Sequence, residues 1–421
     1  MPLLLGCIAD DITGASDLAS VLVASGMRTL QLLGIPEATV DLSETDAVVI
    51  ALKSRTQETQ RAVGDSLQAL DWLRRHECIQ YYFKYCSTFD STDQGNIGPV
   101  ADALLTEMGE TFTLACPGLP INGRTVYNGH LFVHGVLLNE SGMEHHPLTP
   151  MRDANLVRVL GTQTSGKVGL VNHDTLAQGI ASTRAQLRRL AVDYRYAIID
   201  TLNADDLITI GHACSDLKLV TGGSGLALGL ADNFKAKGLL QKSHNASKLA
   251  PVSGDAVVLS GSCSKATREQ VEIFSADHPS LKVDPLALHR GDQTAEQVVH
   301  WFNAHRDQGP VLIYATDAPE AIQQCQLELG TERAGALVEQ LMANVVRRLS
   351  ALGVTKFVIA GGETSGSVVH ALGVSALKIG PTIAPGVPLC QTLDAPSRLL
   401  ALKSGNFGER DFFAKALEMM R

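Results

Sequence analysis

Short apolar segments rich in β-branched residues alternate along the chain with longer segments that carry apolar residues every three or four positions. The first pattern is typical of buried parallel strands and the second of amphipathic helices. The strands predicted in the first part are Leu3–Ala9, Ala47–Leu52, Gln80–Lys84, Thr113–Cys116, Lys167–Asn172, Tyr196–Asp200 and Leu217–Thr221, and those of the second part are Ala256–Leu259, Val311–Tyr314 and Lys356–Ala360. This alternation predicts an α/β fold with mainly parallel sheets flanked by helices.

The length of the chain indicates two domains. Its 421 residues exceed the roughly 250–300 that one hydrophobic core organises. Between the two groups of strands, residues 234–255 are rich in Lys and have no strong periodicity, as expected of a linker. We therefore expect a first domain of residues 1–245, a second of residues 246–421, and a ligand cleft between them.

Composition and charge exclude several classes of protein. The chain is 45% hydrophobic and 19% charged, with a net charge of −9 at pH 7 and no block of five or six like charges. The eight cysteines form no Cys-x-x-Cys pair, which predicts reduced, mostly buried thiols. The N-terminus lacks the basic region of a signal peptide, and no stretch approaches the ~20 apolar residues of a membrane span. We expect a cytoplasmic protein that binds neither nucleic acid nor membrane; a homo-oligomer is compatible with the sequence.

Two adjacent aspartates follow the first predicted strand. Asp10 and Asp11 stand between that strand and a helical pattern that starts at Ser16. Ligands of open parallel sheets bind beyond the carboxyl ends of the strands, and neighbouring carboxylates raise each other's pKa. We therefore predict that at least one of the two aspartates binds a hydroxyl group or acts as a general base. The alternative is that one caps the helix while the other is solvated.

Polar residues follow three more predicted strands, in segments 53–55, 84–90 and 117–124. These strand ends should meet the aspartates at one edge of the sheet. A guanidinium grips a carboxylate through two hydrogen bonds and an ammonium acts as a point charge, so the segments predict a site for a small anionic ligand. Each cation taken alone is equally compatible with a solvated surface. The candidate substrate-binding residues are Arg55, Lys84, Ser87, Asp90 and Arg124.

Two glycine-rich segments match nucleotide-binding motifs only in part. Residues 161–168 resemble a P-loop, but a helical pattern precedes them and a β-rich run follows, which reverses the order that motif requires. Residues 221–229 lack the third glycine of a dinucleotide fingerprint. This partial match leaves an NAD-dependent dehydrogenase as an alternative. We expect the second segment to let a helix pack closely on the sheet or to line the cleft with backbone N–H groups.

Three turns of small residues in the second part predict a phosphate-binding site. Such turns present free backbone N–H groups and the positive end of a helix dipole to an anion. Ordinary turn chemistry explains any one of them equally well, but three together favour a nucleotide. The candidate residues are Ser260 after one strand, Gly361, Gly362, Glu363 and Thr364 after another, and Gly405 near the C-terminus.

No set of residues predicts a zinc site. His130 and His134 have the i, i+4 spacing of a helical metal site, but the apolar residues between them predict a strand. On a strand the two side chains would lie about 13 Å apart, too far to share an ion.

In this order and spacing, the segments resemble the four-carbon acid sugar kinase family over essentially the whole chain. Residues 9–15 (Ala-Asp-Asp-Ile-Thr-Gly-Ala), 122–126 (Asn-Gly-Arg-Thr-Val) and 220–224 (Val-Thr-Gly-Gly-Ser) resemble its substrate domain. Residues 260–262 (Ser-Gly-Ser) and 361–364 (Gly-Gly-Glu-Thr) resemble its nucleotide domain. The resemblance implies ATP and Mg²⁺ as cofactors, and it places nucleotide contacts on Ser260, on Gly361 to Thr364 and on Gly405.

One departure from the family pattern concerns the substrate. Many members carry Lys-Lys-x-Asp-Ser-Thr-Leu-Arg-Gly-Asn where residues 83–96 stand here, with Gln94 in place of the Arg. This segment and residues 403–408 resemble the branch that acts on 3-oxo-tetronate, which implies ATP-dependent phosphorylation of its C4 hydroxyl. Kinases of threonate or erythronate are the alternative within the family, and a sugar-acid sensor without ATP turnover is one outside it.

These residues lead to a hypothesis for the mechanism. The first domain would hold the sugar acid, with Arg55, Lys84 and Arg124 on its carboxylate and oxygens, while Asp11 or Asp10 orients and deprotonates the attacking hydroxyl. The second domain would hold the phosphates of ATP on backbone N–H groups, with Mg²⁺ bridging the phosphate oxygens. Glu363 would ligate that ion through water or cap its own helix.

Overall fold

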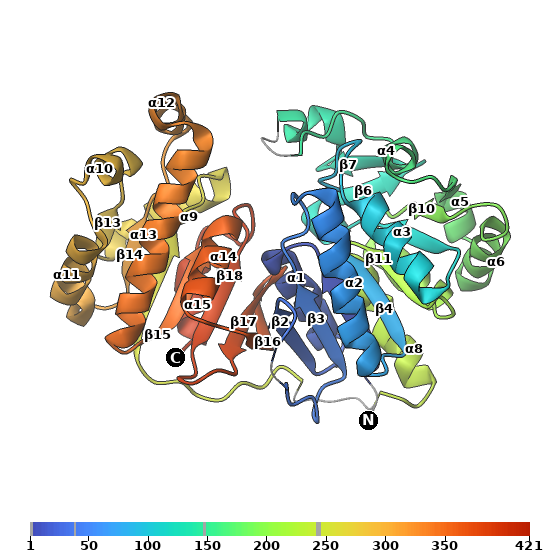
Figure 1. Ribbon diagram of the computed structural model, residues 1–421, viewed down its shortest axis with the longest axis horizontal. Helices are drawn as coiled ribbons and strands as arrows, with labels where there is room; N and C mark the ends of the chain where they lie inside the picture. Colours follow the sequence, from blue (N-terminus) through green and yellow to red (C-terminus); the bar gives the residue numbers. More distant parts are fainter. Residues whose placement is uncertain (1–2, 38, 146–148, 241–245) are drawn as a thin grey trace. The chain divides into compact units, whose positions relative to one another are not determined.

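The chain forms two compact units, Met1–Ser247 and Lys248–Arg421. The computed structural model describes residues 3–37, 39–145, 149–240 and 246–421. Figure 1 shows helices flanking a sheet in each unit. The boundary expected near residue 245 falls outside the described residues.

The sheet of the first unit is parallel throughout. Its strand order is β2-β3-β1-β4-β11-β5-β10-β9. Strand β1 pairs with β3 and β4, and all its residues are buried. The strand bounds are β1 Leu5–Ala9, β2 Thr29–Leu33, β3 Ala47–Ala51, β4 Gln80–Lys84, β5 Thr113–Cys116, β9 Val168–Val171, β10 Tyr196–Ile199 and β11 Leu219–Gly222. The carboxyl ends of β1, β3 and β4 therefore lie side by side.

Helices connect and cover these strands. Their bounds are α1 Ile12–Ala24, α2 Thr59–Arg75, α3 Ile97–Met108, α4 Leu156–Gln163, α5 His173–Leu176, α6 Ile180–Leu190, α7 Ala204–Ala213 and α8 Leu230–Ala236, with 3-10 helices η1 Pro120–Asn122, η2 Leu138–Glu140, η3 Met143–His145 and η4 Ser224–Gly229. Helix α2 packs against α3 and α3 against α4, while α7 packs against α6 and η4. The P-loop-like segment lies where α4 ends and β9 begins, the order that the sequence pattern predicted.

A small antiparallel sheet is attached to the carboxyl end of β10. It consists of β6 Arg124–Tyr127, β7 His130–Val133 and β8 Val136–Leu137. The buried Asp200 accepts hydrogen bonds from the backbone N–H groups of Asn128 (2.8 Å), Gly129 (2.9 Å) and His173 (3.0 Å). Val126 and Thr201 exchange backbone hydrogen bonds of 2.8 Å. These contacts fix the hairpin that carries Arg124.

The sheet of the second unit is mixed. Its strand order is β13-β14-β12-β15-β18-β17-β16, and the pairs from β13 to β18 are parallel. Strands β16, β17 and β18 pair antiparallel, which the sequence pattern did not predict. The bounds are β12 Asp255–Ser260, β13 Ser280–Lys282, β14 Val311–Tyr314, β15 Val354–Ala360, β16 Ala376–Ala384, β17 Val387–Thr392 and β18 Leu399–Lys403.

Helices lie on both faces of the second sheet. The bounds are α9 Lys265–Asp277, α10 Pro285–Arg290, α11 Ala295–His305, η5 Arg306–Gln308, α12 Pro319–Leu329, α13 Thr331–Ala351, α14 Gly362–Ala371 and α15 Phe412–Met419. Phe274 of α9 and Phe412 of α15 share a core with Val258 and Val358 of the sheet. Because side chains alternate between the two faces of a strand, Val257 and its in-register partner Phe357 on β15 lie on the opposite face of the sheet. Helices α13 and α14 pack against β15 and against each other.

The predicted fold class is confirmed, and every predicted strand is present within one or two residues at its ends. His134 lies beyond β7 with a positive φ of 51°. No group of three or more metal-ligating side chains occurs in the described part of the chain. Among the same residues, no helix combines the length and apolar composition that crossing a bilayer requires.

The glycine-rich segment 221–229 packs closely against its neighbours. Gly222 ends β11, and a Cβ atom there would collide with the backbone oxygen of Cys116 on β5. A Cβ atom at Gly229 would lie 2.6 Å from the backbone oxygen of Ile208 on α7. The glycines thus permit close approach, one of the two roles expected for them.

We expect Gly222→Ala to lower the free energy of unfolding by about 1–3 kcal/mol, because the new methyl group overlaps backbone that cannot rotate away. Gly64→Ala is the matched control, since a Cβ atom at Gly64 in α2 meets nothing within 4 Å; it should stabilise by about 0.5–1 kcal/mol. Calorimetric unfolding of both variants checks this. Equal unfolding temperatures for Gly222→Ala and the wild type would contradict it.

Candidate functional site

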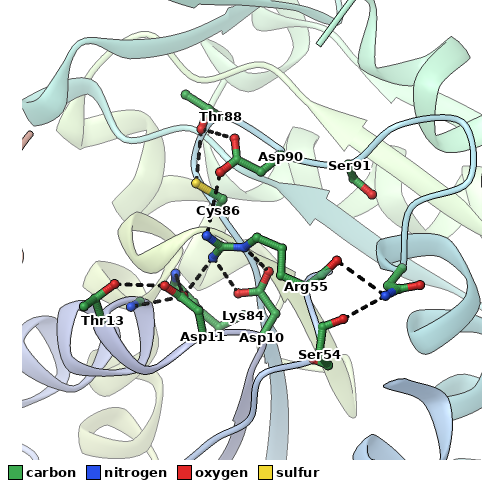
Figure 2. A network of polar contacts seen from close by, with 12 residues as sticks. Asp10, Asp11, Thr13, Ser54, Arg55, Lys84, Cys86, Thr88, Asp90 and Ser91 are labelled. Carbon is green, nitrogen blue, oxygen red and sulfur yellow. Dashed lines mark hydrogen bonds and ion pairs between the residues drawn. The ribbon is translucent and has the colours of Figure 1, made fainter. Parts of the chain in front are cut away.

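Charged side chains from three adjacent strands meet at the carboxyl edge of the first sheet. Ala9 of β1 lies in register with Ala51 of β3 and with Lys84 of β4. Asp10 follows β1 directly, and its backbone N–H donates to the oxygen of Lys84 (3.0 Å). Figure 2 shows the resulting network, with Arg55 between several carboxylates.

Arg55 is the centre of this network. Its Nε and Nη2 donate to the two carboxylate oxygens of Asp10, each at 2.8 Å. Nη2 also donates to Oδ1 of Asp11 at 2.8 Å, and Nη1 lies 3.7 Å from Oδ2 of Asp90. One guanidinium therefore lies against three carboxylates, and little of it stays free to bind a ligand.

Asp11 begins helix α1 as its N-cap. Its side chain accepts hydrogen bonds from Gly14 N (3.1 Å) and from Thr13 Oγ1 (2.9 Å). Burial acts to raise the pKa of Asp11, but the charges of Arg55 and Lys84 outweigh it and hold that pKa well below its usual value. Asp11 is therefore ionised at neutral pH.

Asp10 and Asp11 differ in their access to solvent. The Asp10 side chain is 6% exposed and the Asp11 side chain is 27% exposed. Burial raises the pKa of Asp10, although Arg55 opposes the shift. Asp10 thus anchors Arg55, and Asp11 is the carboxylate that faces outward. The alternative in which one aspartate caps the helix applies to Asp11, whereas Asp10 is not solvated.

Lys84 adds a second positive charge to this network. Its side chain is 4% exposed, and its Nζ lies 3.7 Å from Oδ1 of Asp11. Burial acts to lower the pKa of Lys84, but Asp11 and Asp10 raise it above its usual value. A Cβ atom at Gly14 would collide with this Nζ, so the glycine of the turn makes room for the lysine.

The loop after β4 brings Asp90 to Arg55. Phe89 and Asp90 have positive φ angles of 65° and 31°. Thr88 Oγ1 donates to Oδ1 of Asp90 (2.6 Å) and contacts Sγ of Cys86 at 3.1 Å. Ser87 lies half-buried in the same loop.

Two amide side chains fix this loop at its far end. Asn96 Nδ2 donates to the backbone oxygens of Ser54 (2.8 Å) and Gln57 (2.9 Å), which follow β3. Gln163 Nε2 at the end of α4 donates to Ser91 Oγ at 2.9 Å. A cavity of about 10 Å³ lies beside Asp10, Arg55 and Asp90, enough for about one water molecule. A sugar acid would therefore have to bind on the outer side of the cluster.

Arg124 is a cation without an ion pair in the described part of the chain. Its Nη1 donates to the backbone oxygen of Asn122, while its buried Nε has no hydrogen-bond partner among the residues described. Burial lowers the pKa of Arg124, and the nearby charges of Asp90 and Asp17 oppose the shift. A desolvated guanidinium with an unused donor has the chemistry of an anion-binding group.

The structure adds Asp17 and Ser224, which the sequence analysis did not single out as site residues. Ser224 Oγ donates to Oδ2 of the buried Asp17 at 2.5 Å. Burial raises the pKa of Asp17, and Lys84 opposes the shift. Asp17 lies one helical turn after Thr13, so helical periodicity could have placed it on the face of the site. Its contact with Ser224 of η4 had no local signal.

The second unit brings its predicted residues together at the carboxyl ends of β12, β15 and β18. Ser260 ends β12, and its Oγ contacts Thr316 Oγ1 at 2.7 Å. A Cβ atom at Gly261 would collide with Thr364 Oγ1, and one at Gly361 would lie 2.9 Å from the same oxygen and 3.2 Å from Ser262 N. Gly361 has a φ of 129°. Only glycine fits this close approach of two loops.

Gly405 lies against the same loops. A Cβ atom at Gly405 would lie 2.5 Å from Ser262 Oγ. The backbone oxygen of Gly405 accepts hydrogen bonds from Ser264 Oγ (2.6 Å) and Thr267 Oγ1 (2.7 Å). Ser260, Gly361, Thr364 and Gly405 thus border one region of the second unit.

The N-terminus of α14 fits a phosphate. Gly361 is its N-cap, and among the described residues no side chain caps it. Ser365 Oγ in the first turn is buried and finds no hydrogen-bond partner in the part of the chain that the structure describes. Gly362 and Glu363 are exposed, and a Cβ atom at Gly362 would meet nothing within 4 Å. Free amides at a helix terminus together with an unpartnered hydroxyl suit an anion.

Comparison with known proteins assigns the chain to a family. The model of a sugar-binding N-terminal domain matches residues 5–230, and that of a nucleotide-binding C-terminal domain matches residues 257–413. A Burkholderia multivorans protein named 3-oxo-tetronate kinase is 56% identical over 418 residues, which cover 99% of this chain and 97% of that protein. The chain belongs to the four-carbon acid sugar kinase family. The family resemblance of the motifs is thereby confirmed.

Other members of the family support the assignment over the full length. A 3-oxo-tetronate kinase of Cupriavidus necator is 55% identical over 421 residues, covering 99% of this chain and 97% of that protein. A crystal structure from Salmonella typhimurium LT2, provisionally named a tRNA synthase, has a TM-score of 0.90 at 45% identity and covers 99% of both chains. A Haemophilus influenzae protein of the DUF1537 family has a TM-score of 0.80 at 45% identity, with 99% of this chain and 100% of that chain covered.

We expect Arg55→Met to destabilise the first unit by about 3–5 kcal/mol, because it leaves the buried Asp10 without its cation. Arg61→Met is the control, since Arg61 is 73% exposed in its pair with Asp65 and should contribute at most about 1 kcal/mol. Denaturant unfolding of both variants measures the difference. A loss for Arg55→Met no larger than that of the control would show that the network is not held by this cation.

Proposed function

We propose that this chain is an ATP-dependent kinase that phosphorylates the C4 hydroxyl of 3-oxo-tetronate. The observation that carries the proposal is its full-length relatedness to proteins of that name at 46–56% identity. Two separate clusters support it: a group of charged residues that suits a polyhydroxy acid in the first unit, and a glycine-lined helix terminus that suits phosphates in the second.

Asp11 is the residue that we propose to act on the attacking hydroxyl. It is ionised, faces outward, and is oriented by Arg55, Lys84 and its own helix. Phosphoryl transfer depends mainly on positioning and charge neutralisation, so an acceptor that stays ionised and aligns the hydroxyl is sufficient. Asp10 acts through Arg55, because that guanidinium binds both of its oxygens and its side chain is only 6% exposed.

Arg124 is the residue that we propose to bind the carboxylate of the acid. Its buried Nε lacks a partner and its charge lacks a counterion in the described part of the chain. Lys84, Ser87 and Asp90 are proposed to line the same site. Arg55 is surrounded by three carboxylates, so it should bind an anionic substrate less strongly than Arg124 does.

The second unit is the proposed ATP site, with Ser260, Gly361 to Thr364 and Gly405 around the phosphates. The described residues hold no cluster of three or more metal-ligating side chains. This composition fits Mg²⁺, which usually keeps several waters and binds through the substrate phosphates and one or two carboxylates. Glu363, exposed in the first turn of α14, is the proposed carboxylate. Bound Mg²⁺ would neutralise charge on the phosphates.

Activity on a panel of four-carbon acids tests the proposal. ADP release with MgATP should be confined to a 3-oxo acid when D- and L-threonate, D- and L-erythronate and their 2-oxo and 3-oxo derivatives are compared. Phosphorus NMR should place the phosphate on C4. Turnover of threonate or erythronate instead would contradict the proposed substrate but still support a kinase. Binding of NADH without binding of ATP would favour a dehydrogenase.

We expect Asp11→Asn to lower kcat by about 10²–10⁴-fold, because the neutral amide lacks the negative charge that aligns the attacking hydroxyl and favours its loss of a proton during transfer. The KM for MgATP should stay near the wild-type value, since Asp11 lies in the first unit. Asp193→Asn is the control at an exposed position. An equal loss of ATP affinity would make Asp11 structural or nucleotide-linked.

We expect Arg124→Met to raise the KM for the sugar acid about tenfold to a hundredfold, the effect of losing one charge-assisted contact. Arg124→Lys should lose less, because it keeps the charge. The KM for MgATP should not change, and Arg152→Met provides an exposed control. An unchanged sugar-acid KM in Arg124→Met would remove Arg124 from the substrate site.

A further inference from the structure

Lys403 is a fully buried lysine whose partners in the described part of the chain include no carboxylate. It ends β18 and is 0% exposed. Its Nζ donates to Thr267 Oγ1 (2.8 Å) and to the backbone oxygens of Ser404 (3.2 Å) and Gly405 (2.8 Å). The ring of Phe412 lies on another side, with its centroid 6.0 Å from Nζ. These neutral groups leave the ammonium charge unbalanced.

An unpaired buried charge lowers the stability of a folded protein. Burial lowers the pKa of Lys403 to about 7, and no charged side chain contributes to this shift. By contrast, the other buried lysine of the candidate sites, Lys84, lies beside Asp11. Methionine would fill the space of Lys403 without that cost, so stability alone does not account for a lysine at this position.

The contacts of Lys403 reach two of the loops that border the proposed phosphate site. Its backbone oxygen accepts the N–H of Gly361 at 2.8 Å, directly before α14. Its side chain holds Ser404 and Gly405. Lys403 thus ties the end of β18 to both glycine elements.

Lys403 and residues of α9 turn the carbonyl groups of loop 404–409 inward. Gln270 Nε2 donates to the backbone oxygens of Phe407 (3.2 Å), Gly408 (3.0 Å) and Glu409 (2.9 Å). In a trans peptide the N–H points opposite to the C=O. The N–H groups of Gly405 and Asn406 therefore point away from Lys403, and outward-facing N–H groups of this kind bind anions.

We propose that Lys403 is a positioning residue for nucleotide binding: its ammonium group holds loop 404–409 with the N–H groups of Gly405 and Asn406 turned outward, and the phosphates of the bound nucleotide balance its charge. This inference rests on the proposed ATP site of the second unit. It assigns Lys403 no contact with the reacting atoms.

The test compares Lys403→Met with Lys403→Arg in the full chain. Each charge-assisted hydrogen bond by which Nζ holds Ser404 and Gly405 is worth about tenfold in an equilibrium constant, and Lys403→Met removes both of them. Lys403→Met should therefore weaken MgADP binding by about tenfold or more in calorimetric titration, with the sugar-acid KM unchanged and the unfolding temperature of the free protein equal to or above that of the wild type. Lys403→Arg should bind MgADP more tightly than Lys403→Met.

Lys378→Met is the matched control, because it removes an exposed lysine from β16 of the same unit. Thr267→Val provides a second variant should Lys403→Met fail to fold; it removes one partner of Nζ and should also weaken MgADP binding selectively. Wild-type affinity for MgADP in Lys403→Met, or a loss shared equally by the sugar-acid KM and the unfolding temperature, would overturn the inference. Absence of MgADP binding by the wild type would instead overturn the proposed function together with it.

Discussion

The site of the first unit depends on one constraint: two adjacent carboxylates at the end of a buried central strand must be neutralised. Arg55 binds Asp10 through both oxygens and Asp11 through one, and Lys84 supplies the second positive charge beside Asp11. Because Asp10 is buried, the ion pair is shielded from solvent and holds the guanidinium in one orientation. That orientation in turn fixes Asp11 at the start of α1 and brings Asp90 to the same cation.

This arrangement separates two roles among similar residues. Arg55 binds both carboxylate oxygens of Asp10, so these two residues support the site rather than bind a ligand. Asp11 and Arg124 keep exposed or unpartnered atoms, so they are the groups with chemistry left for a ligand. From the sequence, Arg55, Lys84 and Arg124 were equivalent candidates for binding an anion. Only their partners in the folded chain distinguish them.

In the second unit, glycines allow the loops of the candidate site to pack closely together. Gly261, Gly361 and Gly405 let three loops approach more closely than any side chain would allow. The buried Lys403 then orients one of these loops at an electrostatic cost. Such a cost is typical of binding sites, where a ligand supplies the missing charge.

The sequence by itself determined the strands, the α/β class and the turns that carry the candidate residues, because these depend on local patterns of apolar, small and acidic positions. The sequence did not predict the antiparallel strands β16 to β18. It predicted a strand between His130 and His134, which is β7, but not the pairing of β7 with the strand that carries Arg124. Such pairing depends on partners elsewhere in the chain. Tertiary structure alone decided that Arg55 serves Asp10, that Ser224 meets Asp17 across 207 positions, and that Lys403 is buried without a carboxylate. Such contacts depend on strand register and helix packing, which place residues in space regardless of their distance in sequence.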